Sequence, residues 1–313
     1  MSNNLAYIFA GQGSQAVGMG KDFYENSELA REMFKKAGER IGVDFTKLIF
    51  EENEKLNETA YTQPAILLVQ MVAYRHFRNE CPDLKPKYFL GHSLGEFSAL
   101  CATGAIDFED AIELVHKRGL YMQESCNEIE AGMMAIVGLD DEQVEAICAE
   151  AQREGKSVWP ANYNQDGQLV VAGLKPDLES LEQKFKDARA KRVVLLNMSV
   201  ASHCALLEDA VEKLAPLMEK YIKDSFEAPV ISNVTTKPYS TKAEAIELLK
   251  KQLTSPVRYK QSIQAIAPEI DTAIEFGNGV VLKGLNRRIA KELKTLNISD
   301  TASLQKVKEE VCS

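Results

Sequence analysis

The sequence predicts an α/β fold, in which helices cover a mostly parallel sheet, with an inserted ferredoxin-like subdomain. Over most of the chain, short apolar segments typical of strands alternate with segments typical of helices, the order that produces a parallel sheet. Between residues 133 and 197 the order changes to βαββαβ, which suits a ferredoxin-like unit. A third observation, the GHSLG pentapeptide at 91–95, is typical of a tight turn from a strand into a helix.

The elements of the large domain follow from apolar runs, helical periodicity and capping residues. We expect strands at 5–10, 88–90, 228–233 and 272–276, and helices at 24–41, 63–78, 96–102, 108–125, 204–222, 243–253 and 280–293. The last dozen residues are charged and weakly patterned, so we expect them to fray.

The middle of the chain forms the smaller unit. We expect strands at 133–138, 157–164, 168–173 and 192–196, and helices at 140–153 and 178–190. The sequence Gln165-Asp166-Gly167 supplies the turn of its central hairpin. The domain organisation is therefore a discontinuous large domain of residues 1–130 and 199–313 around a subdomain of residues 131–198.

The pentapeptide at 91–95 fits the G-x-S-x-G nucleophile elbow. The apolar run at 88–90 precedes it and a good helix sequence follows it. In such an elbow the serine adopts a strained backbone conformation, so the flanking positions must be glycine to let strand and helix approach. Ser93 is therefore the candidate nucleophile, although a solvated serine in a glycine-rich turn is the alternative.

Arg118 lies on the apolar face of the helix expected at 108–125, among Phe108, Ala111, Ile112, Leu114, Val115 and Met122. A charged side chain there is costly unless it is paired. Its partner is either an internal carboxylate, which would make Arg118 structural, or a carboxylate that arrives with a ligand.

A nucleophilic Ser93 needs a general base, and the chain has only four histidines among which to look for one. His203 directly precedes the helix expected at 204–222, and at a helix start the helix dipole disfavours the protonated imidazole. It would then stay neutral near pH 7 and accept a proton, so His203 is the candidate base. A purely structural histidine at a helix start stays open as the alternative.

The GQGSQ segment at 11–15 follows the first strand and, with Ala16, matches the dinucleotide-binding pattern G-x-G-x-x-A. That interpretation is disfavoured because no apolar strand ending in an acid follows about 20 residues later. A loop whose backbone N–H groups point at a ligand, and could complete an oxyanion hole, fits better.

Composition excludes several classes of function. The 313 residues include 46 acidic and 37 basic side chains, and the net charge of −9 disfavours non-specific binding to nucleic acid. No apolar run approaches the roughly 20 residues of a membrane helix. The six cysteines are scattered without a C-x-x-C pair, so we expect reduced thiols and a cytoplasmic protein.

Taken in order, these motifs resemble the bacterial malonyl-CoA:acyl carrier protein transacylases, the acyltransferases that feed fatty-acid synthesis. The resemblance spans nearly the full chain and rests on residues 11–15, Gln63-Pro64-Ala65, residues 91–96, Arg118-Gly119, Met122-Gln123, Ala161-Asn162, Gly167-Gln168, Ser202-His203, Gln252 and Pro256-Val257. One departure is Asn278, which stands where the family usually has the proline of a Gly-Pro-Gly turn.

The resemblance implies an α/β-hydrolase-like core and a role for each candidate residue. It makes Ser93 the acyl-carrying nucleophile and His203 its base, and it places the malonyl carboxylate on Arg118. The backbone carbonyl of Gln252 would orient the histidine in place of a triad acid. The residues alone leave three carboxylates open for that third position: Glu208, Asp209 and Asp271.

The resemblance also implies that the backbone N–H groups of Gln12 and Leu94 form the oxyanion hole. The substrates would be malonyl-CoA and the pantetheine thiol of acyl carrier protein, with no metal or redox cofactor. We expect no nucleic acid or membrane partner and a monomer. A serine thioesterase or hydrolase, and a non-catalytic module that binds the carrier protein, are the alternatives.

Overall fold

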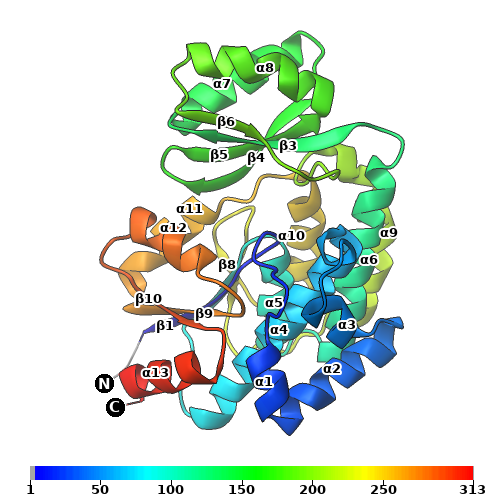
Figure 1. Ribbon diagram of the computed structural model, residues 1–313. Helices are drawn as coiled ribbons and strands as arrows, with labels where there is room; N and C mark the ends of the chain where they lie inside the picture. Colours follow the sequence, from blue (N-terminus) through cyan, green and yellow to red (C-terminus); the bar gives the residue numbers. More distant parts are fainter. Residues whose placement is uncertain (1–3, 313) are drawn as a thin grey trace.

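Two separate β-sheets organise the chain in the computed structural model, which describes residues 4–312 (Figure 1). The larger sheet has the strand order β10-β9-β1-β2-β7-β8. Its strands are β1 (Leu5–Phe9), β2 (Tyr88–Gly91), β7 (Val230–Ile231), β8 (Pro238–Tyr239), β9 (Thr272–Phe276) and β10 (Lys294–Ile298). All neighbours are parallel except β7 and β8, so the predicted α/β fold with a mostly parallel sheet is confirmed.

Strand β1 shows why the sheet is covered on both faces. Leu5, Tyr7 and Phe9 point to one face and belong to a core shared with α4 (Thr59–Glu80) and α6 (Phe108–Cys126), while Ala6 and Ile8 point to the other. The core on that second face is shared with α11 (Tyr259–Ile266) and α12 (Val281–Ile289). A run of apolar residues without alternation is what a strand buried on both faces requires.

The helices of the large domain flank the six-stranded sheet (Figure 1). They are α1 (Lys21–Asn26), α2 (Glu28–Ile41), α3 (Phe45–Phe50), α4 (Thr59–Glu80), α5 (Leu94–Ala102), α6 (Phe108–Cys126), α9 (Glu208–Tyr221), α10 (Lys242–Thr254), α11 (Tyr259–Ile266), α12 (Val281–Ile289) and α13 (Thr301–Val311). No helix within residues 4–312 has the length and apolar character needed to cross a membrane.

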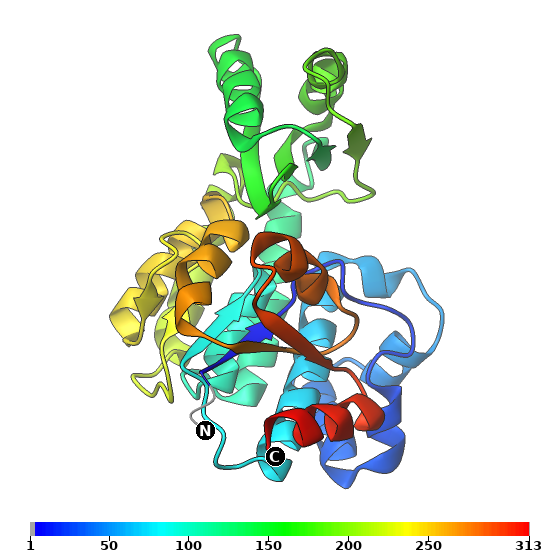
Figure 2. The same cartoon turned by 90° about the vertical axis from the view of Figure 1, so that its left-hand side faces the viewer.

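The second sheet is antiparallel, with the order β4-β5-β3-β6. It lies above the large domain in the view of Figure 2. Its elements are β3 (Ala131–Val137), α7 (Asp141–Arg153), β4 (Val158–Gln165), β5 (Gln168–Leu174), α8 (Lys175–Asp187) and β6 (Arg192–Leu195). This is the βαββαβ order expected of the ferredoxin-like insertion. The exact domain boundaries stay a prediction.

The carboxyl-terminal part differs from the prediction. The helix expected at 280–293 ends at Ile289, and β10 and α13 follow it. The expected fraying is wrong for α13, because Leu304, Val307 and Val311 are buried on one face of a regular helix. Their spacing of three and four residues was a helical signal that the surrounding charges obscured.

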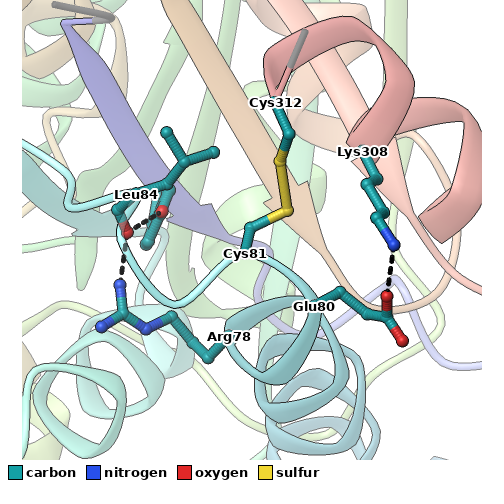
Figure 3. Close-up of a disulfide and its surroundings, with 7 residues drawn as sticks. Arg78, Glu80, Cys81, Leu84, Lys308 and Cys312 are labelled. Carbon is teal, nitrogen blue, oxygen red and sulfur yellow. Dashed lines mark hydrogen bonds and ion pairs between the residues drawn. A yellow bond between two sulfur atoms is a disulfide. The ribbon is translucent and has the colours of Figure 1, made fainter.

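A disulfide joins Cys81, just after α4, to Cys312, just after α13, across 231 positions of sequence (Figure 3). The prediction that all cysteines are reduced thiols is wrong for this pair. Reduced thiols therefore no longer support the expected cytoplasmic location. An ion pair between Glu80 and Lys308 links the same two helices. Four cysteines are free: Cys101, Cys126, Cys148 and Cys204.

Candidate active site

Ser93 lies in a sharp turn between the end of β2 and the start of α5, with φ 54° and ψ −105°. A Cβ atom on Gly91 would lie 1.8 Å from the carbonyl carbon of Gly95, and one on Gly95 would lie 2.0 Å from the carbonyl oxygen of Phe9. Neither position has room for a side chain. The predicted elbow is therefore present, and the two glycines allow its close approach of strand and helix.

Asn233 holds this strained turn in place from the segment after β7. Its Oδ1 accepts from the N–H of Ser93 at 2.7 Å, and its Nδ2 donates to the carbonyl oxygen of Gly91 at 2.6 Å. The side chain is fully buried. Asn233 could not be predicted from the sequence, since no local pattern connects it with an elbow 140 residues earlier.

Ser93 and His203 lie within hydrogen-bond distance, with Oγ and Nε2 at 2.8 Å. The other ring nitrogen, Nδ1, lies 2.7 Å from the backbone carbonyl oxygen of Gln252. Because a carbonyl oxygen only accepts, Nδ1 carries the hydrogen and Nε2 is free to accept from the serine hydroxyl. A main-chain oxygen therefore occupies the place that Glu208, Asp209 or Asp271 would take in a triad.

The reason given above for a neutral His203 is wrong. His203 has a left-handed backbone, with φ 62°, and a 3₁₀ turn at Ala205–Leu207 separates it from the start of α9 at Glu208. Burial, together with the positive charge of Arg118, lowers the pKa of His203 to about 3, against the hydrogen bond to Gln252. The imidazole is therefore neutral at pH 7.

Arg118 reaches the same place from α6 and is only 1% exposed. Its Nη1 donates to Oε1 of Gln63 at 2.9 Å, and its Nη2 lies 3.1 Å from both Oγ of Ser93 and Oε1 of Gln252. The guanidinium also packs on the Phe97 ring, 5.1 Å from its centroid. These contacts hold a cation beside the serine.

Within residues 4–312 no carboxylate forms an ion pair with Arg118, and its buried Nε lacks a hydrogen-bond partner. Arg118 therefore lacks the direct ion pair that a purely structural role would give it. Burial lowers the pKa of Arg118 to about 10, opposed by the charge of Glu96, so the side chain stays charged at pH 7. A buried cation without a direct counter-ion suits an anionic ligand.

A cavity of about 280 Å³ opens over these side chains, between the two sheets. Gln12 and Leu94, whose N–H groups the resemblance assigns to an oxyanion hole, both line it. Its other walls come from both domains and include Gln63, His92, Met122, Met133, Asn162, Gln168, Leu196 and Met198. All the sequence-predicted site residues except Gln252 therefore line this cavity. Gln252 lies behind His203 and Arg118.

Asn278, the departure from the family pattern, makes a contact that proline could not make. Its Nδ2 donates to the carbonyl oxygen of Ser14 at 2.7 Å. The turn between β9 and α12 is thereby tied to the loop that carries Gln12. Gly277 and Gly279 on either side have φ of 105° and 81°, so the turn keeps its two glycines for a conformational reason.

Comparison with protein families places the chain among the acyltransferases. The family model described as "Acyl transferase domain" matches residues 6–310, nearly the whole chain. The class agrees with a serine, a histidine and a buried cation around one cavity.

Individual relatives narrow this class. The chain is 40% identical to the malonyl CoA-acyl carrier protein transacylase of Haemophilus influenzae over 97% of this chain and 98% of that protein. The crystal structure of malonyl-CoA:acyl carrier protein transacylase from Helicobacter pylori superposes with a TM-score of 0.95 at 46% identity, covering 99% and 98% of the two chains. The chain belongs to the malonyl CoA-acyl carrier protein transacylase family.

A further solved structure is a malonyl-transacylase in complex with its type II PKS acyl-carrier protein. It matches with a TM-score of 0.93 at 38% identity and covers 98% of this chain and 99% of that one.

Proposed function

We propose that this protein transfers the malonyl group of malonyl-CoA to the pantetheine thiol of acyl carrier protein through a malonyl ester on Ser93. The observation that carries the proposal is the contact of Ser93 Oγ with both His203 Nε2, at 2.8 Å, and Arg118 Nη2, at 3.1 Å. A base and a cation converge there on one nucleophile. The names of the relatives supply the acyl group and the acceptor.

In the first half-reaction His203 takes the hydroxyl proton of Ser93 at Nε2 while Oγ attacks the thioester carbonyl. The Nδ1 hydrogen, held on the carbonyl of Gln252, keeps the ring in the required tautomer and stabilises the imidazolium. The tetrahedral intermediate collapses, the bond to sulfur breaks, and His203 returns the proton to the departing coenzyme A thiolate.

The negative charge on the carbonyl oxygen needs donors placed in advance. The backbone N–H groups of Gln12 and Leu94 are assigned this role, because both residues line the cavity beside Ser93 and Leu94 begins α5, whose dipole favours negative charge. Each such donor contributes about 3 kcal/mol to the transition state.

The second half-reaction reverses the first with a different thiol. The pantetheine thiol of the carrier protein gives its proton to His203 and attacks the malonyl ester, and Ser93 leaves with the proton. Transfer between two thiols changes the free energy little, so a covalent intermediate shielded from water serves both directions. All of the side chains involved belong to one chain, so the proposed chemistry needs no residue from a second subunit.

Mass mapping after incubation with malonyl-CoA tests the proposal. We expect a stable malonyl mass increase on the peptide that contains Ser93, and its loss only when a carrier thiol is added. A Ser93→Ala protein is the control and should stay unlabelled. Free malonate released without a carrier would instead identify a thioesterase, and the absence of any label on Ser93 would reject the covalent mechanism.

Arg118 accounts for selectivity, because its guanidinium can pair with the malonyl carboxylate, whereas an acetyl group leaves the buried charge unpaired. We expect Arg118→Ala to reduce the preference for malonyl-CoA over acetyl-CoA by about 10- to 100-fold, measured as the ratio of kcat/KM values.

Arg75→Ala is the matched control. Arg75 also packs on an aromatic ring, that of Phe108 at 5.1 Å, but it does not line the cavity. Its removal should leave the preference unchanged. An unaltered preference in Arg118→Ala would show that the malonyl carboxylate binds elsewhere.

We also propose that the product enters fatty-acid elongation and that the enzyme works in the cytoplasm. In support, the relatives are named for malonyl-CoA and acyl carrier protein, the substrates proposed here.

A further inference from the structure

One buried acid has no part in the mechanism above. Glu96 lies in the first turn of α5, three residues after Ser93, and is fully buried. Its Oε2 accepts from Nε2 of Gln252 at 2.8 Å and from the backbone N–H of Asn233 at 3.2 Å. Its Oε1 accepts from the hydroxyl of Tyr239 at 3.0 Å.

The side-chain amide of Gln252 connects this acid to Arg118. Its Nε2 donates to Glu96 and, at 3.0 Å, to the backbone carbonyl oxygen of Ser93. Its Oε1 accepts from Nη2 of Arg118 at 3.1 Å. Because a carboxylate and a carbonyl oxygen accept, they hold the amide with its NH₂ group toward Glu96 and its oxygen toward the guanidinium.

Opposite charges therefore lie on the two sides of one neutral amide. Arg118 on α6 is the charged side chain that acts on Glu96, and Tyr239 on β8 is the titratable group that contacts it. Helix α10 and the segment after β7 present the neutral side chain of Gln252 and the backbone of Asn233. No other counter-charge on Arg118 is found within residues 4–312.

Burial raises the pKa of Glu96 to about 7, against the lowering effect of its hydrogen bonds and of Arg118. The acid can therefore exist in either form near neutral pH. If it is protonated on Oε1, it can donate to the oxygen of Tyr239, whose hydroxyl hydrogen then turns away. Both forms keep the bond from Gln252 to Oε2.

We propose that Glu96 is a positioning residue that balances the charge of Arg118 in the empty site and takes up a proton from solvent when a substrate carboxylate binds Arg118. The inference rests on the proposed function, since it requires an acyl group that carries a carboxylate. Without the proton, two carboxylates would share one buried cation. With it, the cluster keeps the same net charge before and after binding.

The pH dependence of malonyl transfer tests this in the wild-type protein. If malonyl-CoA reacts with the form in which Glu96 is protonated, kcat/KM should fall about tenfold between pH 6 and pH 8. Acetyl-CoA brings no carboxylate to Arg118, so its kcat/KM should lack this fall. Equal pH profiles for the two substrates would overturn the inference.

Glu96→Gln separates charge from geometry. Its amide oxygen can accept from Gln252 and Asn233 at the position of Oε2, and its NH₂ group can donate to the oxygen of Tyr239. We expect its malonyl kcat/KM to be independent of pH and, at pH 8, about tenfold above that of the wild type. A slower enzyme with the wild-type pH profile would overturn the inference and leave Glu96 a structural role.

Tyr239→Phe is the matched control, because it removes one hydrogen bond to Glu96 but keeps the carboxylate, and it should retain the pH dependence. Should Glu96→Gln fail to fold, proton uptake by wild-type protein decides. At pH 7 we expect uptake of up to about half a proton per malonyl group bound, and none with acetyl-CoA.

Equal proton uptake with malonyl-CoA and with acetyl-CoA would overturn the inference. Failure of the proposed function would look different from these outcomes, because no variant would then form a malonyl ester at any pH.

Discussion

Replacing His203 with alanine is expected to slow formation of the malonyl ester about 10³- to 10⁴-fold, the contribution of a general base that is already placed on its nucleophile. The structure gives His203 Nε2 a direct contact with Ser93 Oγ and fixes its tautomer from the other side through Gln252. Rapid mixing with malonyl-CoA, followed by intact-protein mass measurement, gives the rate directly.

The pH profile provides a second arm of this experiment. An ordinary histidine, with a pKa of 6.5, would lose its basic form as the pH falls below that value, whereas His203 has a pKa of about 3. We therefore expect no loss of kcat/KM in the wild type as the pH falls through 6.5.

The same lowered pKa affects stability, with a definite sign. The folded state binds the proton less readily than the unfolded state, so the stability contributed by a neutral His203 is present above pH 6.5 and is lost as the pH falls toward 3. Rates at low pH must accordingly be measured on protein that circular dichroism shows to be folded.

His76→Ala is the control for a general effect of losing an imidazole. His76 lies on α4 and contacts the carbonyl oxygen of Val72 and the hydroxyl of Ser27, away from the cavity. Its loss should leave the acylation rate within a factor of a few of the wild type. A His203→Ala protein with a comparable rate would mean that another group takes the proton.

The elbow was predictable from sequence because everything that makes it is local. Gly91, Ser93 and Gly95 lie within five positions, and the strand before them and the helix after them have clear composition. Arg118 was likewise found from one helix, as a charge on an apolar face. Both inferences needed only one continuous stretch of sequence. The structure places the side chains of Ser93 and Arg118 at one cavity.

The network behind the site could not be predicted in this way. Glu96, Asn233, Tyr239 and Gln252 lie on four separate elements, and the sheet order brings them together. None has a local signature, since buried polar residues resemble exposed ones in sequence until their partners are known. The family resemblance supplied only the backbone of Gln252, whereas its side chain links Glu96 to Arg118.

His203 shows a different limit of sequence analysis. His203 lies beside Ser93 as expected, but the helix expected to start at residue 204 begins later, because the chain takes a left-handed turn at His203 and α9 starts at Glu208. Non-glycine residues adopt such a conformation when surrounding contacts enforce it. Its bonds to Ser93 and Gln252 are such contacts, and they depend on tertiary structure that helix propensity does not contain.

Replacing Gly95 with alanine is expected to abolish acylation and to lower the free energy of unfolding by about 3 kcal/mol or more. A Cβ atom there would lie 2.0 Å from the carbonyl oxygen of Phe9 and 3.1 Å from that of Ala10. Both are backbone atoms, the first at the end of β1 and the second directly after it, in the middle of the sheet. They cannot rotate away as a side chain would. Helix α5 must instead move off the strand and carry Ser93 away from His203.

Gly284→Ala is the matched control, since Gly284 lies within α12 and a Cβ atom there meets nothing within 4 Å. It should stabilise the protein by up to about 1 kcal/mol, because alanine is the better helix former. Urea unfolding and the rate of malonyl ester formation measure both variants. A Gly95→Ala protein with wild-type stability and rate would show that the elbow tolerates a wider spacing, and the close packing of α5 on β1 would then not be what positions the serine.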